Sequence, residues 1–201
     1  MTIMDMIDVY NSNGDHVLGG VNGGDFIDSG TNNSFTAHPL GLVISEGETV
    51  YCENSDGVFH LIGFTDDNEL IIRELSLQDA LEKGIRDAVC TEAALCPELV
   101  IDGVLVPELT EESAAPAMNP RTAIGQRADG TVLLLTIDGR QSDSLGATMK
   151  ELAECMLQNG AVTAAALPCG TITQMYFNGE IQNFPYAPEG PRPCPTAWLV
   201  R

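Results

Sequence analysis

Three short segments of the chain combine glycine with arginine, asparagine or hydroxyl side chains, residue types that suit an anion. They are residues 119–125, 138–141 and 166–175. Each borders a strand-like run, so each is expected to be a loop at the end of a strand. Glycine lets the backbone approach a ligand closely, and a guanidinium group binds a phosphate or carboxylate with two parallel hydrogen bonds. The three loops therefore predict a site for an anionic small molecule.

Two arginines in these loops, Arg121 and Arg140, are the main candidates for holding that anion. They and Arg127 lie within twenty residues of one another in a chain that has 9 basic residues in all. The alternative interpretation, which the sequence leaves open, is that they are ordinary surface residues of strands.

The order of the loops resembles the phosphodiester glycosidase family. The resemblance rests on NPRTAIGQRADGTVLLLTIDGRQ (119–141), GATMKELAECMLQNGAV (146–162) and the glycine–threonine loop that follows. Upstream, VNGGDF (21–26) is similar to the family's Asn-Gly-Gly-Phe-Phe stretch, with Asp25 in place of one Phe. Residues 192–200 resemble its closing strand, so the match covers most of residues 17–200.

Members of that family cleave the bond between an anomeric carbon and a phosphate, and one of them removes N-acetylglucosamine to uncover mannose 6-phosphate. The resemblance implies a set of substrate-binding residues: Asn22, Asn119, Arg121, Thr122, Arg140, Gly170 and Thr171. It leaves Asp138 to carry the acid–base chemistry. No cofactor and no metal are expected.

The third loop departs from the family pattern, which is approximately Leu-Asp-Gly-Gly-(Gly/Thr)-Ser-(Ser/Thr). Here it reads Leu-Pro-Cys-Gly-Thr-Ile-Thr (167–173), so Pro168 stands in the place of the Asp. Proline offers neither an acid nor a base and lacks an N–H group. Asp138 and Asp25 remain as carboxylates.

Three functional hypotheses follow from this departure. In the first, the protein is a phosphodiester glycosidase-type hydrolase that works through Asp138. In the second, it is a catalytically disabled relative that binds or sequesters a sugar phosphate or nucleotide. In the third, it is a structural domain without a ligand.

The charge balance excludes other partners. The 201 residues carry a formal net charge of −20, and nucleic-acid binding requires a cationic face. No apolar run approaches the roughly 18 residues that span a bilayer, so no membrane partner is expected. Without a signal pattern a cytoplasmic location is expected, or export if the sequence is truncated. A homo-oligomer is left open.

The six cysteines contain no Cys-x-x-Cys pair, which argues against a zinc site. We expect free buried thiols; a bridge between Cys90 and Cys96 is the alternative for an exported protein.

The remaining patterns predict one α+β domain over residues 1–201, in which a mixed β-sheet with several hairpins packs with two to three helices. Helices are expected at residues 2–11, 76–89 and 145–158. Hairpins are expected at 40–52, 58–75, 99–106, 121–138 and 173–183, with a closing strand at 196–200. Residues 29–36 are expected to form a flap, and residues 107–118 a loop that frames the site.

Overall fold

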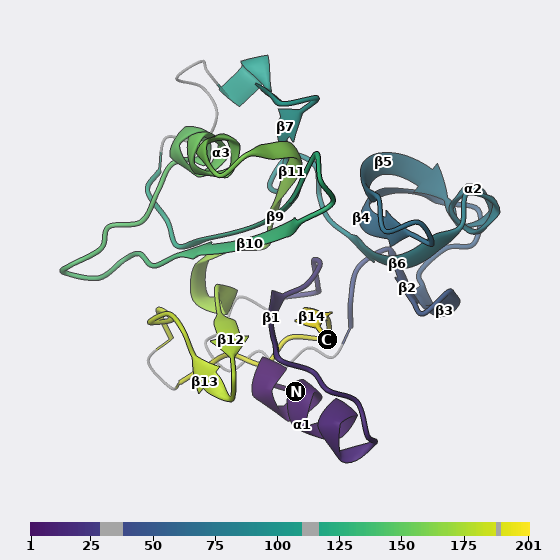
Figure 1. The fold of residues 1–201 in the computed structure, drawn as a ribbon, viewed down its shortest axis with the longest axis horizontal. Helices are drawn as coiled ribbons and strands as arrows, with labels where there is room; N and C mark the ends of the chain where they lie inside the picture. Colours follow the sequence, from purple (N-terminus) through teal and green to yellow (C-terminus); the bar gives the residue numbers. More distant parts are fainter. Residues whose placement is uncertain (29–37, 110–116, 188–189) are drawn as a thin grey trace.

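The fold was analysed in a computed structural model, which describes residues 1–28, 38–109, 117–187 and 190–201. Its strands form three sheets, shown in Figure 1, and the recorded pairings are all antiparallel. With three α-helices packed on these sheets, the predicted α+β class is confirmed.

We name the sheets by position. The central sheet has the order β10 (Val132–Ile137), β9 (Arg121–Arg127), β11 (Ala161–Leu167), β7 (Glu98–Ile101), β8 (Val104–Leu105). The lateral sheet has the order β3 (Glu48–Cys52), β2 (Leu42–Ser45), β6 (Ile85–Cys90), β4 (Val58–Thr65), β5 (Leu70–Ser76). The terminal sheet has the order β13 (Glu180–Ile181), β12 (Met175–Phe177), β1 (Gly19–Asn22), β14 (Ala197–Val200). The predicted hairpins and the closing strand are therefore confirmed.

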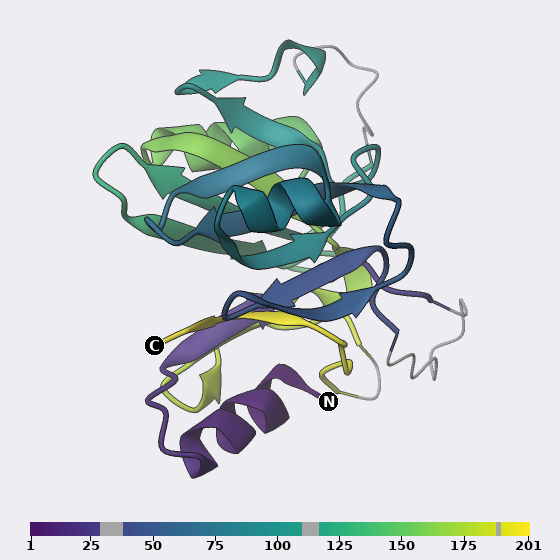
Figure 2. The ribbon, with the colours of Figure 1, turned by 90° about the vertical axis from the view of Figure 1, so that its right-hand side faces the viewer.

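Helix α1 (Ile3–Ser12) begins where the sequence predicts, because Thr2 and Asp5 form a reciprocal capping box. It packs beneath the terminal sheet, at the bottom of Figure 2, where the strand that follows it lies beside the C-terminal strand β14.

Helix α3 (Met149–Gln158) begins four residues later than the predicted start at residue 145. Its cap is Thr148, which forms a second capping box with Glu151. The preceding Gly146 has a φ of +105°, a conformation that a helix cannot contain. The four residues predicted to face inward are buried against the central sheet: Met149, Leu152, Ala153 and Met156.

The predicted helix at residues 76–89 is wrong in its second half. Helix α2 (Leu77–Glu82) ends one turn and a half after its Ser76 cap, and Gly84 follows with a φ of +66°. Residues 85–90 then form β6, which lies between β2 and β4 in the middle of the lateral sheet. Ile85 and Val89 fit a helical spacing, but they also fit a strand that is buried on both faces.

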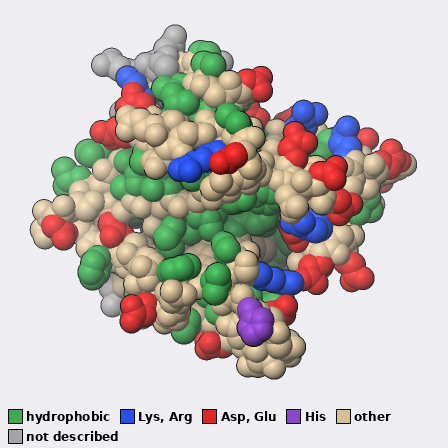
Figure 3. All heavy atoms as spheres, viewed as in Figure 1, with side chains coloured by type: hydrophobic (Ala, Val, Ile, Leu, Met, Phe, Trp, Pro, Cys, Tyr) green, Lys and Arg blue, Asp and Glu red, His purple; other side chains and the backbone are tan. Residues whose placement is uncertain are grey.

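One cluster of buried apolar side chains joins the three sheets. It contains Val21 of β1, Ile62 of β4, Ile124 of β9 and Leu167 of β11. On the face seen in Figure 3, hydrophobic side chains gather in a hollow across the middle, and acidic side chains are spread over much of the surface around it. This cluster therefore packs strands of the three sheets against one another.

Some predicted features lie outside the described residues. These are the flap at residues 29–36 and most of the loop at residues 107–118, of which the structure describes the 3-10 turn η1 (Pro107–Leu109). All six cysteines are described and are free thiols. Burial raises the pKa of the Cys194 thiol to about 12. Within the described part of the chain, no helix has the length and apolarity needed to cross a bilayer.

Candidate functional site

The three predicted loops lie together at one end of the central sheet. Strand β9 is antiparallel to both β10 and β11, and its first residues, Arg121 and Thr122, pair with Ile137 and Leu167. The start of β9 therefore lies beside the ends of both neighbours, which is where the loops at residues 138–141 and 166–175 begin. The strands that carry the three loops are therefore neighbours in one sheet.

Glycines allow the first two loops to touch. A Cβ atom on Gly146 would lie 2.3 Å from the carbonyl oxygen of Asn119, and one on Gly139 would lie 2.6 Å from the nitrogen of Pro120. Both separations are far below a normal contact, so only glycine fits. Asn119 and Ala147 also exchange backbone hydrogen bonds of 3.2 and 2.9 Å. The loop after β10 is thus packed against the segment that leads into β9.

Asn22, Thr122 and Thr173 form a buried polar group beneath the loops. The Thr122 hydroxyl donates to Asn22 Oδ1 at 2.9 Å and lies 3.3 Å from the Thr173 hydroxyl oxygen. Asn22 Nδ2 donates to the carbonyl oxygen of Pro168 at 2.8 Å. Asn22 and Thr122 are 0% exposed. Because their polar atoms bind other parts of the protein, these two residues join the first and third loops to β1.

Arg121 belongs to the same buried layer. Its side chain is 3% exposed, and its Nε and Nη2 atoms donate to the carbonyl oxygens of Ala147 and Ala117, each at 2.9 Å. Its Nη1 atom lies 3.5 Å from the Cys169 sulfur. The guanidinium group therefore ties together loops that are far apart in sequence. Its predicted role as a phosphate ligand stays a prediction.

Arg140 has the opposite setting, since its side chain is exposed. Asn119 Oδ1 accepts two hydrogen bonds from it, from Nε at 3.1 Å and from Nη2 at 2.7 Å. The guanidinium carbon lies 5.7 Å from the ring centre of Tyr186. A Cβ atom on Gly170 would be 3.6 Å from both Nη atoms, so the guanidinium group lies directly over that glycine. Three predicted site residues, Asn119, Arg140 and Gly170, thus meet at the surface.

Asp138 faces a segment that the sequence analysis did not include. Its Oδ1 and Oδ2 atoms accept from the backbone N–H of Phe184 at 3.0 and 2.9 Å, and Oδ1 also accepts from Asn183 Nδ2 at 2.9 Å. Gln141, from the same loop, donates its Nε2 to the Phe184 carbonyl oxygen. The carboxylate therefore holds residues 183–184 in place. Its predicted catalytic role stays a prediction.

Thr171 lies on the other side of the third loop, in the 3-10 turn η2 (Gly170–Ile172). Its hydroxyl oxygen accepts from Arg192 Nη1 at 3.0 Å, and Arg192 also forms an ion pair with Asp28 at 2.9 Å. Thr171 is therefore bound to the C-terminal segment through Arg192. Pro168 is buried, and its carbonyl oxygen receives the hydrogen bond from Asn22.

Asp25 is the second carboxylate that the sequence leaves available. It is half-buried after β1, and its Oδ2 atom accepts from the backbone N–H of Glu92 at 2.6 Å. Burial raises the pKa of the Asp25 carboxyl, and the neighbouring Glu92 carboxylate adds to that rise, against the lowering effect of the Glu92 hydrogen bond. Burial raises the pKa of the Cys96 thiol, and among smaller effects Asp25 adds to that rise while Arg121 opposes it.

Sequence reasoning missed several residues of this region: Thr173, Asn183, Phe184, Tyr186 and Arg192. One signal was available for two of them, because two aromatic residues flank Pro185 in a stretch otherwise typical of a polar loop. Within residues that the structure describes, no group of three or more His, Cys, Asp or Glu residues could hold a metal ion.

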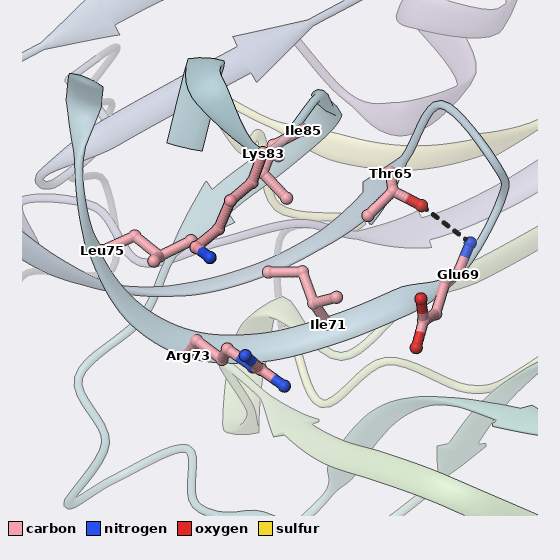
Figure 4. A pocket seen from close by; sticks show the side chains of 7 residues that line it. All are labelled: Thr65, Glu69, Ile71, Arg73, Leu75, Lys83 and Ile85. Atoms are coloured by element: carbon pink, nitrogen blue, oxygen red, sulfur yellow. Dashed lines mark hydrogen bonds between the residues drawn. The ribbon is translucent and has the colours of Figure 1, made fainter. Parts of the chain in front are cut away.

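A separate hollow of about 130 Å³ lies on the lateral sheet, between β5 and α2 (Figure 4). Its lining consists of Thr65, Glu69, Ile71, Arg73, Leu75, Lys83 and Ile85. None of the predicted site residues lines it. We therefore place the candidate site at the loops of the central sheet, because of the chemistry of their residues. The hollow is suggested as a site by its shape.

Comparison with known proteins supports the family. The phosphodiester glycosidase family profile matches residues 15–201. The uncharacterized protein YomE of the SPbeta prophage in Bacillus subtilis (strain 168) is 27% identical over 154 residues, which are 69% of this chain and 23% of that protein.

Two solved structures share the fold. One is the catalytic domain of the zebrafish N-acetylglucosamine-1-phosphodiester alpha-N-acetylglucosaminidase, auto-inhibited by its pro-peptide. Its TM-score is 0.72 at 22% identity, over 98% of this chain and 64% of that one. The other, a protein from Burkholderia pseudomallei K96243, has a TM-score of 0.63 at 18% identity, over 100% of this chain and 68% of that one. The chain thus spans less than two thirds of the zebrafish domain and about a quarter of YomE.

Proposed function

Since this chain belongs to the phosphodiester glycosidase family, we propose that it binds a glycosyl phosphodiester with the phosphate group at Arg140. The proposal rests on the exposure and position of the Arg140 side chain. Arg140 is exposed, oriented by Asn119 and placed over Gly170. Among the described residues, no carboxylate lies within ion-pair distance of it.

The hydrogen-bonding capacity of Arg140 fits this role. A guanidinium group has five N–H donors, and Asn119 receives one from Nε and one from Nη2. The Nη1 donors and one Nη2 donor remain for a ligand, and a phosphate accepts two such donors side by side. The net charge of −20 repels anions at long range, but salt screens that repulsion beyond about 8–10 Å. A local cationic group can therefore still bind a phosphate.

Binding without turnover is the form of this function that the site supports best. Asp138, the carboxylate nearest to Arg140 in sequence, accepts three hydrogen bonds from Asn183 and Phe184. Pro168 stands where the family pattern has its Asp, and it has no ionisable group. Loss of an ionisable group at that place removes the means of activating water or protonating a leaving group.

Hydrolysis is the second candidate, favoured by Asp25. This carboxyl has a raised pKa because it is desolvated, and such a group can hold a proton closer to neutral pH than an ordinary Asp. It occupies the place of a family Phe, in the loop that follows Asn22. In this version of the proposal Asp25 supplies the acid that the third loop lacks.

The zebrafish relative suggests the first compounds to test, because that enzyme is named for an N-acetylglucosamine 1-phosphodiester. Calorimetric titration with the methyl diester of N-acetylglucosamine 1-phosphate measures binding. Arg140→Ala should weaken that binding about 10- to 100-fold, the usual scale for a charge-assisted hydrogen bond. Arg127→Ala is the matched control, since Arg127 is an arginine of the same hairpin whose Nε donates to the Asn159 carbonyl oxygen.

The outcomes separate the candidates. Binding that Arg140→Ala weakens and Arg127→Ala leaves unchanged supports the phosphate site. Equal losses in both variants indicate a non-specific charge effect and contradict it. Chromatography that measures release of N-acetylglucosamine from the same diester distinguishes a hydrolase from a protein that only binds the diester. If Asp25→Asn abolishes that release while binding persists, hydrolysis through Asp25 replaces the binding-only form.

A further inference from the structure

Two exposed aromatic side chains, Phe184 and Tyr186, lie on the segment that Asp138 and Gln141 bind, and Tyr186 contacts Arg140. Phe184 is 75% exposed and Tyr186 is 41% exposed. Leu145, 65% exposed, comes from the loop after β10, where its carbonyl oxygen accepts from the backbone N–H of Arg140 at 3.3 Å. Exposed apolar residues are common singly, whereas several of them around a polar group are typical of a ligand-binding surface.

The backbone of Phe184 is held from both sides, although its side chain points into solvent. Asp138 binds its N–H group, and Gln141 binds its carbonyl oxygen. Both partners come from the Asp-Gly-Arg-Gln loop that also contains Arg140. Because the backbone that carries this ring is already held in place, binding of an apolar group there costs less conformational entropy than binding to a mobile segment.

Tyr186 connects the apolar residues to the cation. Its ring centre lies 5.7 Å from the guanidinium carbon of Arg140, within the range of a cation–π contact. An anion bound at Arg140 would therefore have aromatic surface immediately next to it. Tyr186 thus borders the proposed phosphate site and lies two residues from Phe184 in the chain.

We infer that Phe184, Tyr186 and Leu145 form a subsite for the aglycone, so that the ligand is a glycosyl phosphodiester of an apolar alcohol. The inference rests on the proposed function, because the phosphate of that diester is the group at Arg140. One ester oxygen carries the sugar and the other carries the apolar group. Burial of that group against the two rings adds to the affinity, whereas a methyl ester has almost nothing to bury.

The experiment compares three diesters of N-acetylglucosamine 1-phosphate, with methyl, benzyl and octyl groups, by calorimetric titration. Benzyl or octyl should bind about 10- to 100-fold more tightly than methyl, the gain expected from burying one apolar side group. A preference for benzyl over octyl identifies an aromatic aglycone, and the reverse identifies an alkyl chain.

Phe184→Ala should bring the affinities for the three diesters to within about 3-fold of one another by removing most of the buried apolar area. Phe177→Ala is the matched control, because Phe177 is also exposed, at 49%, but lies on β12 in the terminal sheet. It should keep the preference of the parent protein. Leu145→Ala tests the subsite from the other segment and should lower the preference for the benzyl and octyl diesters over the methyl diester.

Two results overturn the inference in different ways. Equal affinity for all three diesters, with Arg140→Ala still harmful, removes the apolar subsite and leaves the phosphate site intact. Absence of binding for all three removes the proposed function and the subsite together. The inference is also wrong if Phe184→Ala and Phe177→Ala lower the preference for the benzyl or octyl diester by the same amount.

Discussion

Arg121 and Arg140 lie at the same end of one β-hairpin, yet they are built for different tasks. Arg121 begins β9, is 3% exposed and donates to two carbonyl oxygens of the protein. Arg140 follows β10, is exposed, and donates from its guanidinium group to Asn119 Oδ1. The same residue type thus serves as an internal brace in one loop and as a candidate ligand in the other.

This difference shows that a cation near a glycine is not evidence of an anion site by itself. Backbone carbonyl oxygens can use the donors of a guanidinium group as fully as a phosphate can. What distinguishes the two arginines is the number of donors left over and their access to solvent. Both properties depend on residues distant in sequence, such as Ala147 for Arg121.

The strongest test of the difference between Arg121 and Arg140 is the Arg121→Ala variant. The change leaves the carbonyl oxygens of Ala117 and Ala147 without their donors and opens a cavity, so it should lower the free energy of unfolding by about 2–4 kcal/mol. Arg140→Ala should change it by less than about 0.5 kcal/mol, because the side chain is exposed. Urea unfolding followed by circular dichroism measures both. Equal losses of unfolding free energy in the two variants would contradict the different roles of the two arginines.

The next prediction concerns the residue that orients Arg140. Asn119→Ala removes the acceptor of two of its hydrogen bonds and should weaken binding of the methyl diester about 3- to 10-fold, less than loss of Arg140 itself. Calorimetry measures the affinity, and Asn159→Ala serves as a control at a surface asparagine away from the loops. An Asn119→Ala variant that binds as tightly as the parent would show that orientation is not limiting.

The same comparison distinguishes two roles for Asp138. It is either a structural residue that holds residues 183–184 or a group that takes part in the reaction. Asp138→Asn loses the charge in its bonds with Asn183 and Phe184, so it should lower the free energy of unfolding by about 1–2 kcal/mol. Chemical denaturation gives this value. If the protein hydrolyses the diester, Asp138→Asn should lower turnover no more than Phe184→Ala does. Loss of turnover with unchanged stability would instead assign the chemistry to Asp138.

The elements were predictable where local signals agree. Asn178-Gly179 turns β12 into β13, as the sequence predicts, and helix α3 is present but begins at its Thr148 cap, four residues after the predicted start. The loops could be placed together because antiparallel hairpins bring the start of one strand beside the end of the next. The register of β9 with β10 confirms that reasoning.

The contacts within the site were not predictable, because they join residues far apart in sequence. Phe184 binds Asp138 across 46 positions, and Asn22 binds Pro168 across 146. No periodicity records such pairs. The end of α2 was missed for a local reason, since Lys83-Gly84 is a helix stop that the apolar spacing of Ile85 and Val89 outweighed.

The smallest expected effect belongs to Asp25 and depends on pH. Burial raises the folded-state pKa of the Asp25 carboxyl above its ordinary value. The folded state therefore binds more protons than the unfolded state, and stability falls as pH rises from the unfolded pKa through the folded pKa. Asparagine stays neutral and can still accept the Glu92 hydrogen bond.

Asp25→Asn should therefore raise the thermal midpoint at pH 7, and the gain should shrink below pH ~4, where the parent carboxyl is protonated in both states. Thermal unfolding from pH 3 to pH 8 measures it. Asp56→Asn, at an exposed acid, removes the same charge and corrects for the general effect of a less negative chain. If Asp25→Asn is the less stable protein at neutral pH, then the ionised carboxylate stabilises the loop, and Asp25 is a brace like Arg121 rather than a proton donor.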